Sequence, residues 1–304
     1  MRIWRCTITS DRRRATGAVL LSLWLAGCTD LFFVPMRQQV FKPEQLGVEA
    51  TDTWLQAGDG TRLFSWHLPA PEARGVVCYF HGNAENISTH IVNVAWLPAA
   101  GYEVLLVDYR GYGASHGEAE FPEVLADVQA GLDWCLARGR ETGRPAFALG
   151  QSLGAALLLE VAARPPYRES LGGVIADSGF SGYRQIARDA LSHSWLTVPL
   201  KYPLSLLVTA QHDPAAAVRD MAPLPLFVLH SPEDRVVPYA HGERIFAAAN
   251  APKCFRKTAG PHNAAFRDPG NRAALLAFMA SARSAGGPQC DAAIPAAGAA
   301  AATP

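Results

Sequence analysis

Gly150-Gln151-Ser152-Leu153-Gly154 is the stretch of this chain that says most about its fold. It follows the apolar run 145–149 and precedes the run 155–160, so the pattern predicts a short buried strand that turns sharply into a helix. A serine on such a turn is held in a strained backbone conformation with its hydroxyl pushed clear of the sheet. The glycines on either side are needed because side chains there would collide where strand and helix nearly touch. Ser152 is therefore the candidate nucleophile, and the free N–H groups at the helix start face any negative charge formed beside it.

The five-residue pattern alone is only suggestive. With 26 glycines in 304 residues, a Gly-x-Ser-x-Gly string arises by chance in about one such chain in ten. The alternative is a glycine-rich turn that happens to contain a serine. The strand-then-helix context favours the nucleophile turn. Whether Ser152 is a nucleophile then depends on whether the chain also supplies a matching acid and base.

The rest of the chain alternates between strands and helices. A hairpin is predicted at Gly58-Asp59-Gly60. From residue 75 onward, near-continuous apolar strands alternate with amphipathic helices, which indicates an α/β fold with a mostly parallel sheet covered by helices on both faces. In such sheets the reactive groups gather at the carboxyl ends of the strands. The predicted strands are 75–80, 102–108, 145–149, 172–177, 224–230 and 253–258, and the predicted helices are 87–100, 120–138, 153–163, 239–250 and 264–283.

Three further loops, each after a predicted strand, carry the other reactive groups. The loop 81–86 can aim a backbone N–H, that of Asn83, at the place where an oxygen becomes negative. The N–H of Leu153 is the second predicted donor of this oxyanion hole. Asp234 is the predicted acid and His262 the predicted base. The chain order Ser, Asp, His is the one expected for a nucleophile turn in an α/β sheet.

Six stretches together resemble the α/β-hydrolase superfamily, and more narrowly its compact serine hydrolases that carry His-Gly-Asn-Ala-x-Asn after the third strand. That group includes membrane-tethered protein depalmitoylases and bacterial esterase-like proteins. Two positions depart from it: Glu85 stands where the group often has glycine, and Ser231 stands where His-Gly is usual. The matching stretches are 81–86, 108–115, 150–154, 177–181, 234–238 and 260–262, spread over nearly all of residues 50–285.

The resemblance implies a serine hydrolase that needs neither cofactor nor metal. Ser152 would attack an acyl carbon, and His262 would take the serine proton and later return it to the leaving group. Asp234 would hold the tautomer of His262, while the N–H groups of Asn83 and Leu153 stabilise the oxyanion.

Other residues stay open for these roles. Asp177 also ends a predicted strand, and a triad can draw its carboxylate from a neighbouring strand; Asp108 and Glu233 are weaker alternatives. His81 is expected to support its own loop, because His262 already stands at the position of the base. His241, like His193 and His212, has no partner spacing and is expected to face solvent or to lie in an insertion.

Residues 183–217 separate two predicted core strands and form an insertion too long for a plain connection. Such insertions often form lids or binding walls, and the apolar density of this one suits an acyl or alkyl group. The expected substrate is therefore a small or acylated molecule, a carboxylic ester or thioester with an apolar acyl part. The alternative is a locally packed helix pair with no ligand role. The apolar residues are Leu191, Trp195, Leu196, Val198, Pro199, Leu200, Tyr202, Leu204, Leu206, Leu207 and Val208.

Residues 1–27 predict a leader that is not part of the fold. Five arginines precede the apolar run 17–25, which is too short to span a bilayer. The ending Leu25-Ala26-Gly27-Cys28 resembles the lipobox of bacterial lipoproteins, in which the cysteine is acylated and becomes the new N-terminus; several acyl chains give stable anchoring. Ordinary secretory cleavage and an uncleaved anchor are the alternatives. Thr29 in place of an acidic residue favours the outer membrane, so the expected location is the bacterial cell envelope, lipid-anchored and facing the periplasm.

The remaining chain divides into a membrane-proximal linker at 28–45, one hydrolase domain at 46–285 and an Ala/Pro-rich tail at 286–304. The tail is predicted to be disordered, because it cannot bury enough apolar surface to order itself. Outside residues 1–27 there are 22 basic and 26 acidic residues and no basic run. This balance argues against a nucleic-acid partner.

The cysteines show no spacing typical of metal ligands, so no metal site is expected. Cys78 lies in an apolar strand and is expected to be an ordinary core residue. In an oxidising compartment, Cys254 and Cys290 are a candidate disulfide. The pairing among Cys78, Cys135, Cys254 and Cys290 stays open.

Two other functions stay open beside the ester hydrolase. A small-peptide aminopeptidase would need an acidic pocket for a free amine, and Glu85 is the one hint of such a pocket in the sequence. A non-catalytic envelope lipoprotein would have no need for Ser152, Asp234 and His262 in order. The sequence shows no glycine fingerprint for a nucleotide and no haem motif.

Overall fold

The computed structural model describes residues 33–192, 195, 197–208, 210–282, 284 and 286–289. The leader, Cys28 and the chain from residue 290 lie outside these residues, so the expectations attached to them remain expectations. Of the described helices, none is long and apolar enough to cross a membrane.

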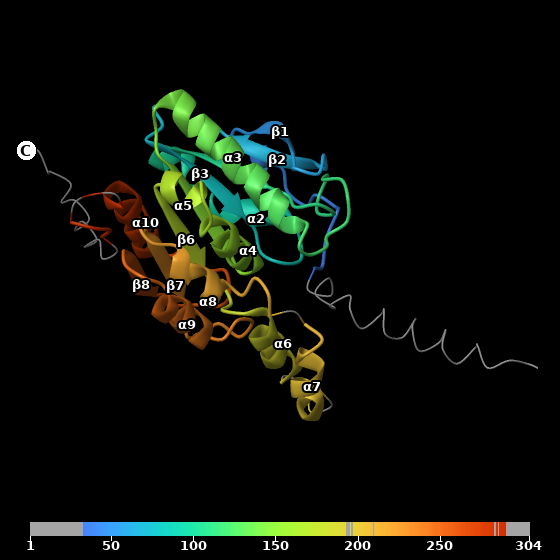
Figure 1. The fold of residues 1–304 in the computed structure, drawn as a ribbon. Coiled ribbons are helices and arrows are strands. Elements are labelled where there is room, and N and C mark those ends of the chain that lie inside the picture. Colours follow the sequence, from blue (N-terminus) through green and yellow to red (C-terminus); the bar gives the residue numbers. More distant parts are fainter. Residues whose placement is uncertain are drawn as a thin grey trace, which may run out of the picture.

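An eight-stranded sheet in the order β1-β2-β4-β3-β5-β6-β7-β8 forms the centre of the described chain (Figure 1). β2 pairs antiparallel with both β1 and β4, and all other neighbours pair parallel. This confirms the predicted α/β fold with a mostly parallel sheet. The strands are β1 (Thr51–Gln56), β2 (Arg62–Leu68), β3 (Gly75–Phe80), β4 (Tyr102–Val107), β5 (Ala146–Gln151), β6 (Gly173–Asp177), β7 (Leu226–His230) and β8 (Lys253–Lys257).

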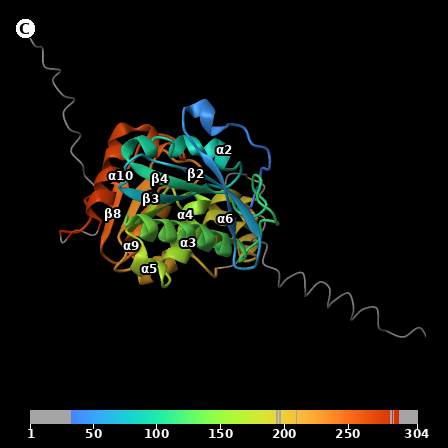
Figure 2. The same ribbon diagram turned by 90° about the horizontal axis from the view of Figure 1, so that it is seen from above.

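Helices cover both faces of the sheet, with α2 and α10 on one side and α3 and α9 on the other (Figure 2). The helices are α2 (Ile87–His90), α3 (Val124–Thr142), α4 (Leu153–Ala162), α5 (Tyr167–Ser170), α6 (Tyr183–Leu191), α7 (Lys201–Ser205), α8 (Pro214–Ala217), α9 (Ala240–Ala248) and α10 (Pro269–Ser281). Single 3-10 turns lie at Pro43–Leu46, Ile91–Asn93, Pro98–Ala100, Val198–Leu200, Val218–Asp220 and Ala265–Arg267.

The core consists of two apolar layers, one on each face of the sheet. Successive side chains of β3 alternate between them: Val76, Cys78 and Phe80 join the layer under α3 and α4, whereas Val77 and Tyr79 join the layer under α10. Every residue of β3, β4 and β5 is buried. Burial on both faces explains why these strands read as continuous apolar runs in the sequence.

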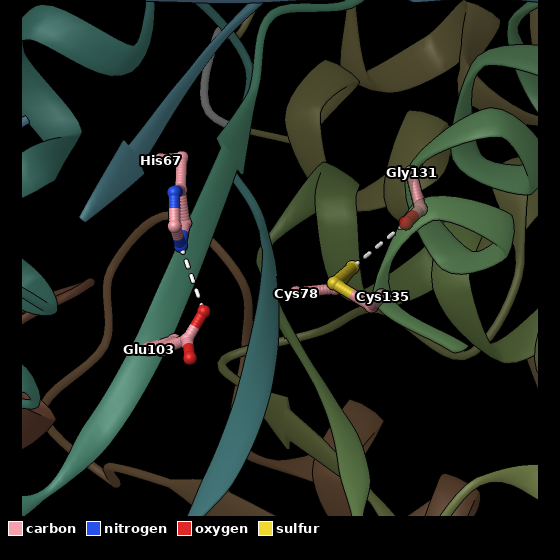
Figure 3. Close-up of a disulfide and its surroundings, with 5 residues drawn as sticks. All are labelled: His67, Cys78, Glu103, Gly131 and Cys135. Carbon is pink, nitrogen blue, oxygen red and sulfur yellow. Dashed lines mark hydrogen bonds and ion pairs between the residues drawn. A yellow bond between two sulfur atoms is a disulfide. The ribbon is translucent and has the colours of Figure 1, made fainter. Parts of the chain in front are cut away.

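A disulfide between Cys78 and Cys135 joins β3 to α3 (Figure 3). The expectation that Cys78 is an ordinary core residue was therefore wrong. α3 packs directly on β3, and the two Cα atoms lie 6.2 Å apart although 57 residues separate them in sequence. Sγ of Cys78 also lies 3.0 Å from the carbonyl oxygen of Gly131, a contact and not a hydrogen bond, because a disulfide sulfur carries no proton. Cys254 is disulfide-bonded too, but its expected partner Cys290 lies outside the described residues.

Removing the Cys78–Cys135 disulfide is expected to lower the free energy of unfolding by about 4 kcal/mol, because the bond closes a loop of 57 residues in the unfolded chain. The measurement is urea unfolding of Cys78→Ala/Cys135→Ala beside the wild type. Cys254→Ala is the control, because it removes the other disulfide and leaves the Cys78–Cys135 bond intact. An unchanged midpoint in the double variant would contradict the prediction.

Candidate active site

Ser152 lies on the sharp turn between β5 and α4, with φ 54° and ψ −115°. Both flanking glycines are required by close backbone contacts. A methyl carbon built at Gly154 would lie 2.1 Å from the carbonyl oxygen of Phe80, and one built at Gly150 would lie 2.6 Å from Cα of Ala155. The left-handed conformation of Ser152 is costly for a residue with a side chain, and such strain is typical of functional sites.

His262 and Asp234 come from the loops after β8 and β7 and form a short hydrogen bond. Nδ1–H of His262 donates to Oδ2 of Asp234 at 2.6 Å. The other carboxylate oxygen, Oδ1, accepts the backbone N–H groups of Val236 and Val237 at 2.8 and 2.9 Å. This arrangement fixes the proton of the imidazole on Nδ1 and leaves Nε2 as the nitrogen that can accept a proton.

Asp234 is held in its ionised form. Burial alone raises the pKa of this carboxyl, but the hydrogen bond and charge of His262, together with the two backbone N–H groups, hold it below its ordinary value. Since the pKa is lower in the folded chain, the carboxylate contributes stability above its unfolded pKa. That contribution is lost as the pH falls through the folded pKa.

The turn at Ser152 and the loop of His262 meet at Gly82. A methyl carbon built at Gly82 would lie 3.4 Å from Cβ of Ser152 and 3.5 Å from Nδ2 of Asn263, the neighbour of His262. Among the hydrogen bonds of the described residues, none joins Ser152 to His262. Catalytic hydrogen bonds are often long in enzymes without substrate and shorten when substrate binds.

Asp177 has other partners than His262. Its Oδ2 accepts from Nε2 of Gln151 at 2.9 Å, and its Oδ1 accepts from the hydroxyl of Ser178 at 3.0 Å. Burial raises its pKa despite these bonds. Asp108, the second alternative, accepts the backbone N–H of Ile87 at 2.9 Å. The geometry therefore favours Asp234 as the acid.

The two predicted oxyanion donors lie on elements that flank Ser152. Leu153 is the first residue of α4, and Asn83 lies in the loop between β3 and α2. The side-chain oxygen of Asn83 accepts the backbone N–H of Ala84 and the hydroxyl of Tyr112, both at 2.8 Å. These bonds fix the side chain of Asn83 within its loop.

A buried polar network lies beneath the turn and was not predicted from the sequence. Oε1 of Gln151 accepts from the hydroxyl of Tyr79 at 2.8 Å and from Nδ2 of Asn93 at 2.9 Å, and Nδ1 of His90 lies 3.3 Å away. Burial and the neighbouring His81 lower the pKa of His90 to about 3, so its ring is neutral. In the sequence Gln151 is only the spacer of a motif and His90 a lone histidine, so no signal marked them.

A second Ser-His-Asp arrangement lies apart from Ser152. The hydroxyl of Ser181 donates to Nδ1 of His241 at 2.8 Å, and Nε2–H of His241 donates to Oδ2 of Asp189 at 2.8 Å. The expectation that His241 faces solvent or lies in the insertion was wrong, because it belongs to α9 and is fully buried between that helix and α6. Ser181 is buried as well, and its own backbone N–H also donates to Nδ1 of His241 at 3.0 Å. This group joins α6 to the core.

A surface cleft of about 640 Å³ borders His262. This volume lies within the range of small-molecule sites. Its walls combine apolar and charged groups, which are Pro232, Glu233, Arg235, Val236 and Pro261. Within the described part of the chain, no cluster of three or more metal-ligating side chains occurs.

The insertion 183–217 carries most of its large apolar side chains on the outside. Leu206 and Tyr202 are 61% and 62% exposed, and Leu200 is exposed as well. α6 and α7 pack on each other, with Nε of Arg188 donating to Oγ of Ser205 at 2.9 Å, and both extend from the body of the molecule (Figure 1). The described apolar side chains of the insertion therefore form part of the outer surface of the molecule.

Comparison with known proteins identifies several relatives. The family described as "Serine aminopeptidase, S33" matches residues 71–223. The uncharacterized protein YfhR of Escherichia coli K12 is 30% identical over 227 residues, which cover 73% of this chain and 75% of YfhR. Lysophosphatidylserine lipase ABHD12 of Rattus norvegicus is 27% identical over 253 residues, or 73% of this chain and 62% of the lipase.

The esterase Pf2001 of Pyrococcus furiosus has a similar solved structure. It superposes with a TM-score of 0.61 at 19% identity and covers 76% of this chain and 89% of its own. At this identity the likeness shows the fold alone.

Proposed function

Because this chain belongs to the serine aminopeptidase S33 family of α/β-hydrolases, it is a hydrolase, and we propose that it cleaves carboxylic esters or thioesters with an apolar acyl part. The observation that carries the proposal is the 2.6 Å hydrogen bond from His262 to Asp234, with the loop of His262 meeting the strained turn of Ser152 at Gly82. Among the relatives, one is named a lysophosphatidylserine lipase. This name favours an ester over a peptide substrate.

The proposed reaction has two halves. Nε2 of His262 takes the proton of Ser152 as its oxygen attacks the acyl carbon, and the N–H groups of Leu153 and Asn83 receive the oxyanion. Collapse of this intermediate breaks the bond to the alcohol or thiol, which leaves with the proton from His262. Water, deprotonated by the same imidazole, then attacks the acyl-serine and releases the acid. Throughout, Asp234 stabilises the imidazolium and remains a carboxylate.

A second candidate is cleavage of a substrate with a free amine, and Glu85 favours it. Oε2 of Glu85 lies 3.7 Å from Nε2 of His90, and Cε1 of His90 lies 3.3 Å from a methyl carbon built at Gly82 beside Ser152. The backbone φ of Glu85 is 61°, a conformation that glycine adopts at a lower cost than other residues. Glu85 therefore has a strained backbone, and its exposed carboxylate lies beside His90.

A panel of nitrophenyl esters from acetyl to dodecanoyl tests the substrate class. We expect kcat/KM to rise by at most about fourfold for each added methylene, the factor for burying about 0.8 kcal/mol, until the acyl site is filled. Aminoacyl nitroanilides in the same panel are expected to react slowly. Equal turnover at every acyl length would count against an apolar acyl site, and faster turnover of nitroanilides, lost in Glu85→Gln, would favour the aminopeptidase.

The proposed location is the bacterial envelope, with the chain anchored through acylated Cys28 and facing the periplasm. The support is the sequence Leu25-Ala26-Gly27-Cys28. Cys28→Ser is expected to abolish incorporation of labelled palmitate and to move the protein out of the membrane fraction, since several acyl chains are needed for stable anchoring. Cys254→Ser is the matched control. Membrane recovery of Cys28→Ser equal to the wild type would rule out acylation as the anchor.

A further inference from the structure

The first described residues of the chain, 33–42, run along the loop 81–86, and we call them the N-terminal strap. Their sequence reads as part of a linker, yet they are hydrogen-bonded to the domain. Phe33 is buried in the apolar layer that includes Tyr112. The backbone N–H of Val34 donates to Oδ1 of Asn83 at 2.9 Å.

Asn86 makes the central contact with the strap. Its Nδ2 donates to the carbonyl oxygens of Met36 and Gln38 at 3.0 and 2.8 Å. Its Oδ1 accepts the backbone N–H and the hydroxyl of Ser88 at 2.9 and 2.6 Å and so caps α2. Asn86 is fully buried. Both donors and the acceptor of the amide are thus in use, since an amide side chain supplies two N–H donors and a carbonyl acceptor.

Further bonds extend the contact on both sides. The hydroxyl oxygen of Ser88 accepts the backbone N–H of Val40 at 2.8 Å. The carbonyl oxygen of Met36 accepts the backbone N–H of Gly113 at 2.9 Å. Arg37 reaches the loop after β4, where its guanidinium donates to the carbonyl oxygens of Ser115 and Gly117 at 3.1 and 3.0 Å.

The loop 81–86 needs such support because its backbone is strained. Ala84 and Glu85 are successive non-glycine residues with φ of 57° and 61°. Each costs about 1 to 2 kcal/mol in this conformation, which persists only where the surroundings enforce it. Oδ1 of Asn83, just before the strained pair, and the amide of Asn86, just after it, both bind the strap.

We propose that Asn83 and Asn86 are positioning residues, which bind the strap and thereby hold the backbone of the loop 81–86 in the geometry that an oxyanion donor requires. This inference rests on the proposed function, in which the N–H of Asn83 is one of the two donors. Hydrolysis then depends on a segment that begins five residues after the proposed anchor, Cys28.

Asn86→Asp in the full chain tests the proposal. The aspartate keeps the oxygen that caps α2 but replaces both donors by an oxygen that faces two carbonyls. We expect kcat on a nitrophenyl ester, per site titrated with a fluorophosphonate, to fall by about tenfold to a hundredfold, as for a reacting group displaced by 1 Å. KM should stay within a factor of about three, because ground-state binding is untouched.

Asn250→Asp is the matched control, since its amide donates to the carbonyl of Arg219 at 2.8 Å on the exposed surface, and its kcat should equal the wild type. Ser88→Ala is the milder variant if Asn86→Asp does not fold; it removes the acceptor for Val40 and should lower kcat by about threefold. Hydrogen exchange of the amides of residues 81–86 gives a readout independent of activity and should quicken in both variants.

Unchanged exchange in the loop of a folded Asn86→Asp chain would overturn the proposal, as would quickened exchange with an unchanged kcat per titrated site. If no chain shows hydrolysis that depends on Ser152, the proposed function fails instead. The exchange measurement then still decides whether the strap holds the loop.

Discussion

Ser152→Ala is expected to lower kcat for ester hydrolysis by about 10⁵- to 10⁶-fold and to abolish labelling by a fluorophosphonate. Alanine removes the oxygen that forms the acyl-enzyme while the donors of the oxyanion hole remain. The residual activity should therefore be the small acceleration over water that binding and these donors supply.

Ser181→Ala is the control for this experiment, because Ser181 belongs to the other Ser-His-Asp arrangement of the molecule. Its hydroxyl is buried and its backbone N–H still donates to His241 in the variant. We expect activity and labelling of Ser181→Ala to match the wild type. Activity that survives Ser152→Ala and is lost in Ser181→Ala would show that Ser181 is the nucleophile and would refute the proposed site.

Asp234→Asn is expected to lower kcat by about 10⁴-fold. Oδ1 of Asp234 accepts two backbone N–H groups, so an asparagine must place its oxygen there and turn its NH₂ group toward His262. Nδ1 of His262 then has to accept a hydrogen bond, and the imidazole proton moves to Nε2. In that tautomer the ring cannot take the proton of Ser152.

Asp177→Asn separates the two candidate acids. Its carboxylate accepts from Gln151 and Ser178, so the exchange is expected to disturb the network beneath the turn and to lower kcat by less than about tenfold. Measured kcat values per titrated site decide the matter. A loss near 10⁴-fold in Asp177→Asn with a small effect in Asp234→Asn would exchange the two roles.

The strands and the nucleophile turn could be predicted from the sequence because both depend on patterns of residues that are close together in the chain. The predicted strand 75–80 matches β3, since a strand buried on both faces is a continuous apolar run. The predicted helix 120–138 is displaced: α3 begins at Val124, after Pro122, and ends at Thr142. The next residue, Gly143, has a φ of 65°, which is typical of a helix C-cap. Helix boundaries of this kind depend on single residues such as proline and glycine, which the periodic spacing of apolar residues does not reveal.

The partners of side chains could not be predicted in the same way, because they depend on packing between distant segments. Cys78 meets Cys135 only because α3 crosses β3. His241 looked isolated in sequence and is bonded to residues 60 and 52 positions away. Nor does the composition of the insertion 183–217 reveal which way its leucines face.

The outward leucines and tyrosine of α7 and its flanks have a practical consequence for handling the protein. An apolar surface of this kind, with Lys201 as the one charged residue between 190 and 212, is a liability for colloidal stability in aqueous buffer. Copies that meet through it would precipitate or form aggregates at high concentration and ionic strength. A mild detergent above its micelle concentration, included from lysis onward, would shield these side chains and keep the preparation monodisperse.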